Sequence, residues 1–182
     1  MAYCGICGTD LHEYLAGPIF VPPQGSKDPN TGAELPVTLG HEFCGTVAVN
    51  PAMDDRHHGH QTCEQCLSGC QNRCTRLAFY GLSHGQGGFA QHIVVKPAAL
   101  ILLPQNISLK LASLAEPLSV AAHMIRISGF QPGQNVLVLG TGPIGCALIM
   151  ILRAKGAATI IASEVSELRA AQALSFGADE VV

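Results

Sequence analysis

Residue types that bind zinc gather at separated places in the first half of the chain. The first is the segment Cys4-Gly5-Ile6-Cys7-Gly8-Thr9-Asp10-Leu11-His12, and the second, about thirty residues later, is Gly40-His41-Glu42. A catalytic zinc takes three protein ligands and leaves a fourth position for water or substrate. Taken alone, His41 would be a core histidine and Glu42 a surface carboxylate. Together with Cys7 they predict a catalytic zinc site.

A further carboxylate is a candidate for the same site. Glu116 lies in Ala115-Glu116-Pro117, and it could act as a zinc ligand or as a hydrogen-bond partner of the bound water. The residue types alone leave open whether Glu42 or Glu116 ligates the metal.

A third cluster, Cys63-x2-Cys66-x3-Cys70-x3-Cys74, has the spacing of a structural zinc site. Its four cysteines could close a tetrahedral site, and so could His60 with Cys63, Cys66 and Cys74. The alternative is a group of inert thiols. Residues 50–80 show no hydrophobic periodicity with which to build a core, and this favours a metal-supported lobe.

A glycine-rich turn follows the apolar run 136–139 and precedes a helical pattern. Gly140 permits the tight turn, Gly142 lets the backbone approach a pyrophosphate, and Gly145 lets the helix pack close to the strand. The helix N-terminus offers free N–H groups to phosphates. Glu164 lies 19 positions after Gly145, where a carboxylate accepts hydrogen bonds from a ribose diol and repels a 2′-phosphate. The pattern predicts an NAD site, rather than a turn with an accidental acid, formed by Gly140, Gly142, Pro143, Ile144, Gly145 and Glu164.

Composition excludes several classes of protein. The 182 residues are 48% hydrophobic and 13% charged with a net charge of −3, which gives no signature of a nucleic-acid partner. No apolar run is long enough to span a membrane, and no signal peptide is expected. The eight cysteines lie beside His, Asp and glycine-rich motifs, so we expect a reduced, cytoplasmic, metal-binding protein instead of a disulfide scaffold.

Periodicity predicts an α/β protein with a β-rich first part. Glycine and proline predict short strands and loops over the first 60 residues. The later alternation of strands and helices is a βαβ pattern and predicts a parallel sheet. The predicted strands are 42–49, 89–95, 136–139, 159–162 and 180–182, and the predicted helices are 113–127, 143–155 and 166–176.

Several of these motifs together resemble the zinc-containing medium-chain alcohol dehydrogenases. The matching segments are 7–12, Gly40-His41-Glu42-Phe43, 115–117 and 140–145, and residues 12–20 are most similar to the branch that contains butanediol and sorbitol dehydrogenases. The resemblance implies an incomplete GroES-like catalytic domain over 1–117 and part of a Rossmann NAD-binding domain over 118–182. It also implies a homo-oligomer that oxidises a secondary alcohol or vicinal diol with zinc and NAD.

The same resemblance implies roles for individual residues. Thr9 and His12 would pass the alcohol proton to solvent, and Asp10 would orient the histidine ligand. The family's structural-zinc spacing, C-x2-C-x2-C-x7-C, matches His60, Cys63, Cys66 and Cys74, with Cys70 inside the last spacer.

Departures from the family pattern predict an incomplete copy. Strands before the first motif, a strand between Val47 and Ala48 and the later dinucleotide-sheet strands are expected in the family and have no counterpart in these residues. We therefore expect little or no turnover from the 182 residues alone. The competing hypotheses are a non-catalytic remnant that binds zinc and a zinc-binding interaction module that uses residues 50–80.

Overall fold

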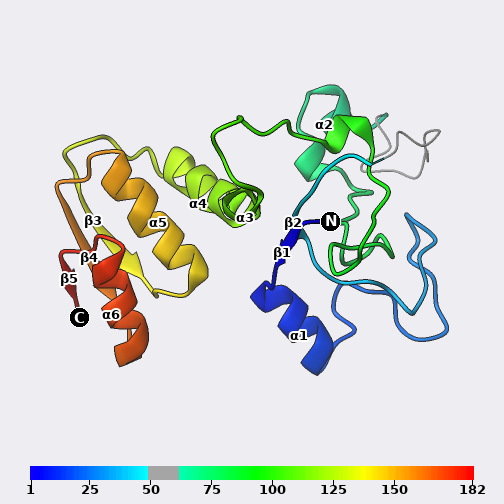
Figure 1. Ribbon diagram of the computed structural model, residues 1–182, viewed down its shortest axis with the longest axis horizontal. Helices are drawn as coiled ribbons and strands as arrows, with labels where there is room; N and C mark the ends of the chain where they lie inside the picture. Colours follow the sequence, from blue (N-terminus) through cyan, green and yellow to red (C-terminus); the bar gives the residue numbers. More distant parts are fainter. Residues whose placement is uncertain (49–61) are drawn as a thin grey trace. The chain divides into compact units, whose positions relative to one another are not determined.

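The computed structural model describes residues 1–48 and 62–182. The chain divides into two compact units, Met1–Leu114 and Ala115–Val182 (Figure 1). Each unit is described by itself.

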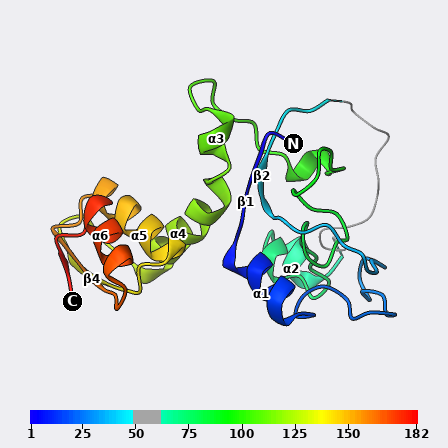
Figure 2. The same ribbon diagram turned by 60° about the horizontal axis from the view of Figure 1, so that its bottom comes forward.

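The first unit has short elements joined by long loops. Strand β1 (Tyr3–Gly5) pairs antiparallel with β2 (Glu42–Cys44), as Figure 2 shows, and the register places Gly5 opposite Glu42. This pairing brings the two predicted ligand segments together. The remaining elements of the unit are α1 (Gly8–Ala16), α2 (Glu64–Leu67), η1 (Gln71–Arg73), η2 (Pro97–Ala99) and α3 (Leu109–Ala112).

Helix α1 corrects the expectation of strands and loops over the first 60 residues. It begins after Cys7, whose backbone N–H donates to the Asp10 carboxylate at 3.0 Å. An acid three residues after the N-cap is half of a capping box, so the start signal was present in the sequence. Glu13, buried in the helix, accepts the backbone N–H groups of Ile19 at 2.8 Å and Phe20 at 2.9 Å, which fixes the turn after the helix.

Two predicted strands are also corrected. The strand expected over 42–49 ends at Cys44 within the described residues, and 89–95 forms no strand. Around this second segment the backbone N–H groups go to scattered acceptors. Phe89 donates to the Leu39 carbonyl at 3.0 Å, whereas Val94 donates to the Gln86 side chain at 3.1 Å. Alternating side chains need one continuous partner strand to form a ladder, and residues 89–95 have none among the described residues.

The second unit is a βαβαβ arrangement preceded by a long helix. Its three-stranded parallel sheet has the order β3-β4-β5. Helices α5 and α6 contact each other and the strands, and α4 packs on α5 (Figure 1). The predicted α/β class is confirmed. The elements are α4 (Ala115–Ser128), β3 (Asn135–Leu139), α5 (Pro143–Ala154), β4 (Thr159–Ser163), α6 (Glu167–Ser175) and β5 (Glu180–Val181).

The core of this unit lies between the sheet and its helices. Ile149 of α5 and Ile160 of β4 are fully buried there, together with Ala162 and Ala173. Arg153 of α5 donates to the Asp179 carboxylate at 2.7 Å, and that carboxylate also accepts the Ile160 N–H at 2.7 Å. These bonds tie the helix to the ends of two strands. In the described part of the chain, no helix combines the length and the apolar character that a membrane crossing requires.

Candidate functional site

The structure brings Cys7, His41 and Glu42 together in the first unit. One ligand atom from each lies within 4.8 Å of the others. Cys7 precedes α1, Glu42 is the first residue of β2 and His41 comes directly before it, so the β1–β2 pairing joins segments more than thirty residues apart. The grouping provides a sulfur, an imidazole nitrogen and a carboxylate oxygen, which is a donor set that zinc accepts.

A single buried carboxylate ties these segments to each other. Asp10 is 3% exposed. Its Oδ2 accepts the Cys7 N–H at 3.0 Å, and its Oδ1 accepts the Gly40 N–H at 3.0 Å. The same Oδ1 lies 3.4 Å from Nδ1 of His41. A buried carboxylate is costly unless it is hydrogen-bonded, and here its acceptors face both ligand segments.

The surroundings of the His41 imidazole indicate whether a metal ion fits this site. Its Nδ1 is buried and has no hydrogen-bond partner, although the Asp10 carboxylate lies 3.4 Å away. A metal-binding histidine commonly turns one ring nitrogen to a carboxylate and the other to the metal. With Nδ1 facing Asp10, Nε2 is the nitrogen available to a zinc ion, so the residues present fit that ion.

The backbone at Gly5 leaves room for the Glu42 carboxylate. A Cβ at this position would lie 2.2 Å from Oε2 and 3.2 Å from Cβ of Glu42. Any side chain larger than hydrogen would therefore push Glu42 aside. This role of Gly5 could not be predicted from the sequence, because a glycine beside a cysteine carries no signal of its partner across the strands.

Thr9 and His12 occupy one face of α1 beside Cys7. Thr9 Oγ1 lies 3.6 Å from Cys7 Sγ and is half-buried, whereas His12 is exposed one helical turn further on. This places a hydroxyl near the metal-ligand group and an imidazole at the solvent.

Cys4, although close in sequence, differs from Cys7. Burial, followed by the nearby Asp10 charge, raises the pKa of the Cys4 thiol to about 11. Cys4 is not part of the group of close ligand atoms.

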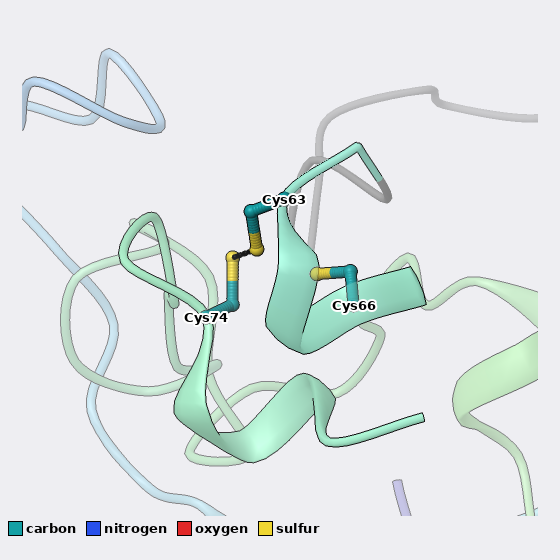
Figure 3. A group of neighbouring side chains, drawn as sticks. All are labelled: Cys63, Cys66 and Cys74. Carbon is teal, nitrogen blue, oxygen red and sulfur yellow. Dashed lines mark hydrogen bonds between the residues drawn. The ribbon is translucent and has the colours of Figure 1, made fainter. Parts of the chain in front are cut away.

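The cysteine-rich lobe forms a second group. The sulfurs of Cys63, Cys66 and Cys74 lie within 4.8 Å of one another. Figure 3 shows these three side chains gathered together. Cys63 and Cys74 sulfurs face each other at 3.9 Å without a disulfide. The backbone N–H of Cys66 lowers the pKa of Cys63, and the N–H of Arg76 donates to Cys74 sulfur at 3.3 Å. For Cys63 this favours the thiolate, which is the form that binds metal.

The fourth member of this group differs between the two ligand sets that the sequence allows. Cys70 caps η1 and is not in the group of close sulfurs. His60 lies outside the described residues. The geometry of the three sulfurs fits a zinc ion with one further ligand, and the four-cysteine set is disfavoured.

The glycine-rich turn of the second unit has the geometry expected of a phosphate site. Gly140 has φ of +82°, and a Cβ at Gly145 would lie 2.0 Å from the Gly140 carbonyl oxygen. By contrast, a Cβ at Gly142 would meet nothing within 4 Å, so the space over this turn is open. Gly142 caps α5, whose first residue is Pro143, and Ile144 follows it.

Glu164, directly after β4, points back to this turn. Its Oε2 accepts the N–H of Thr141 at 2.9 Å and the Thr141 hydroxyl at 3.0 Å, and its Oε1 accepts the Ser166 N–H at 3.0 Å. These donors, the Thr141 N–H first, lower the pKa of Glu164 to about 2. The contact to Thr141 was missed from the sequence, because the residue occupies a variable position of the glycine motif.

Glu116 lies in the first turn of α4 and belongs to the second unit. Its role as a ligand stays a prediction.

Comparisons with known proteins identify the family. The chain matches the alcohol dehydrogenase GroES-like domain over residues 1–105. It is 39% identical to (R,R)-butanediol dehydrogenase of Saccharomyces cerevisiae, covering 98% of this chain and 53% of that protein. The crystal structure of 2R,3R-butanediol dehydrogenase from Bacillus subtilis superposes with a TM-score of 0.80 and 38% identity, covering 98% of this chain and 53% of that one.

A further solved relative holds a cofactor. A zinc-binding dehydrogenase from Sinorhizobium meliloti, described as putative and bound to NADP, superposes with a TM-score of 0.82 and 33% identity, covering 98% of this chain and 52% of that one.

The chain spans about half the length of the relatives that it matches. Its alignment with the yeast protein extends over 204 positions, more than the 182 residues of this chain, so this chain has internal deletions relative to that protein. Within the matched half, the sequence motifs, the fold and the percentage identity all indicate the same family. The chain belongs to the zinc-containing medium-chain alcohol dehydrogenase family.

Proposed function

We propose that this chain supplies the zinc-binding and cofactor-binding half of an NAD-dependent dehydrogenase that oxidises a secondary alcohol or a vicinal diol of the 2,3-butanediol type. The observation that carries the proposal is the group of Cys7, His41 and Glu42 held by Asp10. The butanediol dehydrogenases among its relatives support the substrate class.

In this proposal, the candidate metal-site residues have defined tasks. Cys7 and His41 hold the metal, and Glu42 or Glu116 provides the third ligand. Zinc, when bound, supplies Lewis-acid chemistry that lowers the pKa of an alcohol. The Asp10 carboxylate lies 3.4 Å from Nδ1 of His41, and it holds the backbone of both ligand segments by accepting the N–H groups of Cys7 and Gly40.

Thr9 and His12 of α1 transfer the alcohol proton to solvent. The Thr9 hydroxyl, 3.6 Å from Cys7 sulfur, accepts the proton and donates its own toward His12. His12 is exposed, so its imidazole exchanges the proton with bulk water. Thr9 and His12 are three residues apart in α1, so the hydroxyl and the imidazole lie on the same face of the helix.

The second unit binds the cofactor. The open face at Gly142 and the free N–H groups of α5 receive the pyrophosphate, and the Glu164 carboxylate receives the adenosine ribose. The carboxylate favours NAD, which carries two ribose hydroxyls, over NADP. The nicotinamide, when bound, supplies the hydride acceptor.

The cysteine-rich lobe has a structural task in this proposal. Three sulfurs from one short segment, with His60 as the fourth ligand, close the coordination sphere and leave no position for substrate. A second function, zinc-dependent binding of a protein partner by this lobe, is kept as an alternative if the first site proves to bind no metal.

The test combines a binding measurement with a catalytic one. The chain is loaded with Co²⁺, and its visible spectrum is recorded with and without (R,R)-2,3-butanediol; the diol is expected to shift the bands of the wild type but not of Cys7→Ser. NADH formation from NAD and the diol is then followed by absorbance, and little or no turnover is expected from the 182 residues alone, which span about half of their relatives. Catalysis that survives Cys7→Ser, or a cobalt spectrum insensitive to the diol, would contradict the proposal.

A further inference from the structure

The contact between Thr141 and Glu164 is not explained by phosphate binding. Thr141 is 1% exposed, and both of its donors reach the same oxygen of Glu164. Its hydroxyl also lies 3.2 Å from the Arg169 carbonyl oxygen. A hydroxyl has one proton, and a carboxylate is the stronger acceptor, so we assign the donation to Glu164.

The lone pairs of the carboxylate can be counted. Each oxygen has two acceptor sites. Oε2 fills both with the N–H and hydroxyl of Thr141, whereas Oε1 accepts, from the residues that the structure describes, only the Ser166 N–H. Oε2 is therefore the anchored oxygen, and Oε1 is the oxygen with acceptor capacity left for a ligand.

We propose that Thr141 is a positioning residue that holds Glu164 in place and thereby sets the preference for a nicotinamide cofactor with a free 2′-hydroxyl over one with a 2′-phosphate. This inference rests on the proposed NAD-binding function. Oε1 of the anchored carboxylate accepts from the ribose hydroxyl, and its fixed negative charge repels a phosphate at the same place.

The neighbouring side chain of Arg169 makes the cofactor preference depend on the position of the Glu164 carboxylate. Arg169 of α6 is exposed and close enough for its charge to act on the Glu164 carboxylate. When the anchor is lost and Glu164 rotates away, the guanidinium becomes available to a 2′-phosphate.

The experiment measures binding, not turnover. Dissociation constants for NADH and NADPH are obtained from the fluorescence of the bound nucleotide for the whole chain. The variants are Thr141→Val, which removes the hydroxyl, and Thr141→Ser, which keeps it. Thr159→Val, at the start of β4 in the same unit, is the matched control.

The preference for NADH over NADPH is expected to fall roughly 3- to 10-fold in Thr141→Val, about the effect of one hydrogen bond. Thr141→Ser and Thr159→Val should keep the wild-type preference. Glu164→Gln should also lower the preference for NADH. Adding Thr141→Val to Glu164→Gln should lower this preference no further, because the threonine acts through the carboxylate.

Two results separate this inference from the function on which it rests. An unchanged preference in folded Thr141→Val, or an equal additional loss in the Glu164→Gln background, would overturn the positioning role alone. A wild-type chain that binds neither nucleotide would overturn the proposed function, and this inference with it. If circular dichroism shows that Thr141→Val is unfolded, Thr141→Ala is judged by the same criteria.

Discussion

The two candidate zinc sites of the first unit are built in different ways. Cys63, Cys66 and Cys74 come from one segment of twelve residues, and local backbone N–H groups face their sulfurs. Cys7, His41 and Glu42 come from segments more than thirty residues apart, and they meet only because β1 pairs with β2 and Asp10 bonds to both. A local site depends on its own ligands, whereas an assembled site depends equally on residues that touch no metal.

The largest effect is expected from a ligand of the local site. Cys74→Ser should weaken zinc binding by the lobe roughly 10²- to 10³-fold, about a quarter of the free energy of a four-ligand site. Cys70→Ser is the matched control and should retain zinc, because Cys70 is outside the group. His60→Ala should resemble Cys74→Ser. Competition with a chromophoric chelator measures these affinities.

Equal zinc retention in His60→Ala and Cys70→Ser would contradict the assignment of His60. A strong loss of zinc affinity in Cys70→Ser would instead support the four-cysteine ligand set.

The assembled site should be sensitive to a residue that is not a ligand. Asp10→Asn leaves a single acceptor oxygen where two backbone N–H groups and the His41 ring now face a carboxylate. We expect zinc binding at this site to weaken about 10- to 100-fold, while the lobe keeps its zinc. A two-phase cobalt titration separates the two sites.

Asp28→Asn is the control, because Asp28 also accepts backbone N–H groups, from Asn30 at 2.9 Å and Thr31 at 2.8 Å, within a different loop. Equal weakening of both metal phases in Asp10→Asn would mean that Asp10 supports the unit as a whole, not the site.

A smaller effect is expected from the space beside Glu42. Gly5→Ala places a methyl group where Oε2 of Glu42 now lies, so the carboxylate must move away from Cys7 and His41. The cobalt spectrum should change, with metal affinity weakened by several-fold, roughly the effect of one displaced hydrogen bond or ligand contact. The methyl group of Gly8→Ala would have no neighbour within 4 Å, so this variant should leave the cobalt spectrum and the metal affinity unchanged. An unaltered spectrum in Gly5→Ala would show that the Glu42 position is irrelevant to the metal.

The same contrast explains how much of the molecule could be predicted from its sequence. In the second unit, local periodicity, the glycine turn and the βαβ order determine the fold, and α5 and β4 lie close to their predicted bounds. The candidate metal ligands could also be selected from the sequence, because Cys, His and Glu beside glycine are unusual combinations.

The rest depends on contacts between distant residues. The buried bonds of Asp10 to Gly40, the clearance of Gly5 for Glu42 and the contact of Thr141 with Glu164 all cross the chain. No local pattern encodes them. The strand predicted over 89–95 was wrong for the same reason, since alternation shows which faces are apolar but not whether a partner strand is present.

The most direct test of the assembled site is the number of zinc ions per folded chain, measured by elemental analysis after dialysis. The wild type is expected to hold about two, Cys7→Ser about one, and Cys74→Ser about one. Circular dichroism first confirms that each variant is folded. A wild type and Cys7→Ser with the same zinc content would contradict the claim that Cys7, His41 and Glu42 form a metal site.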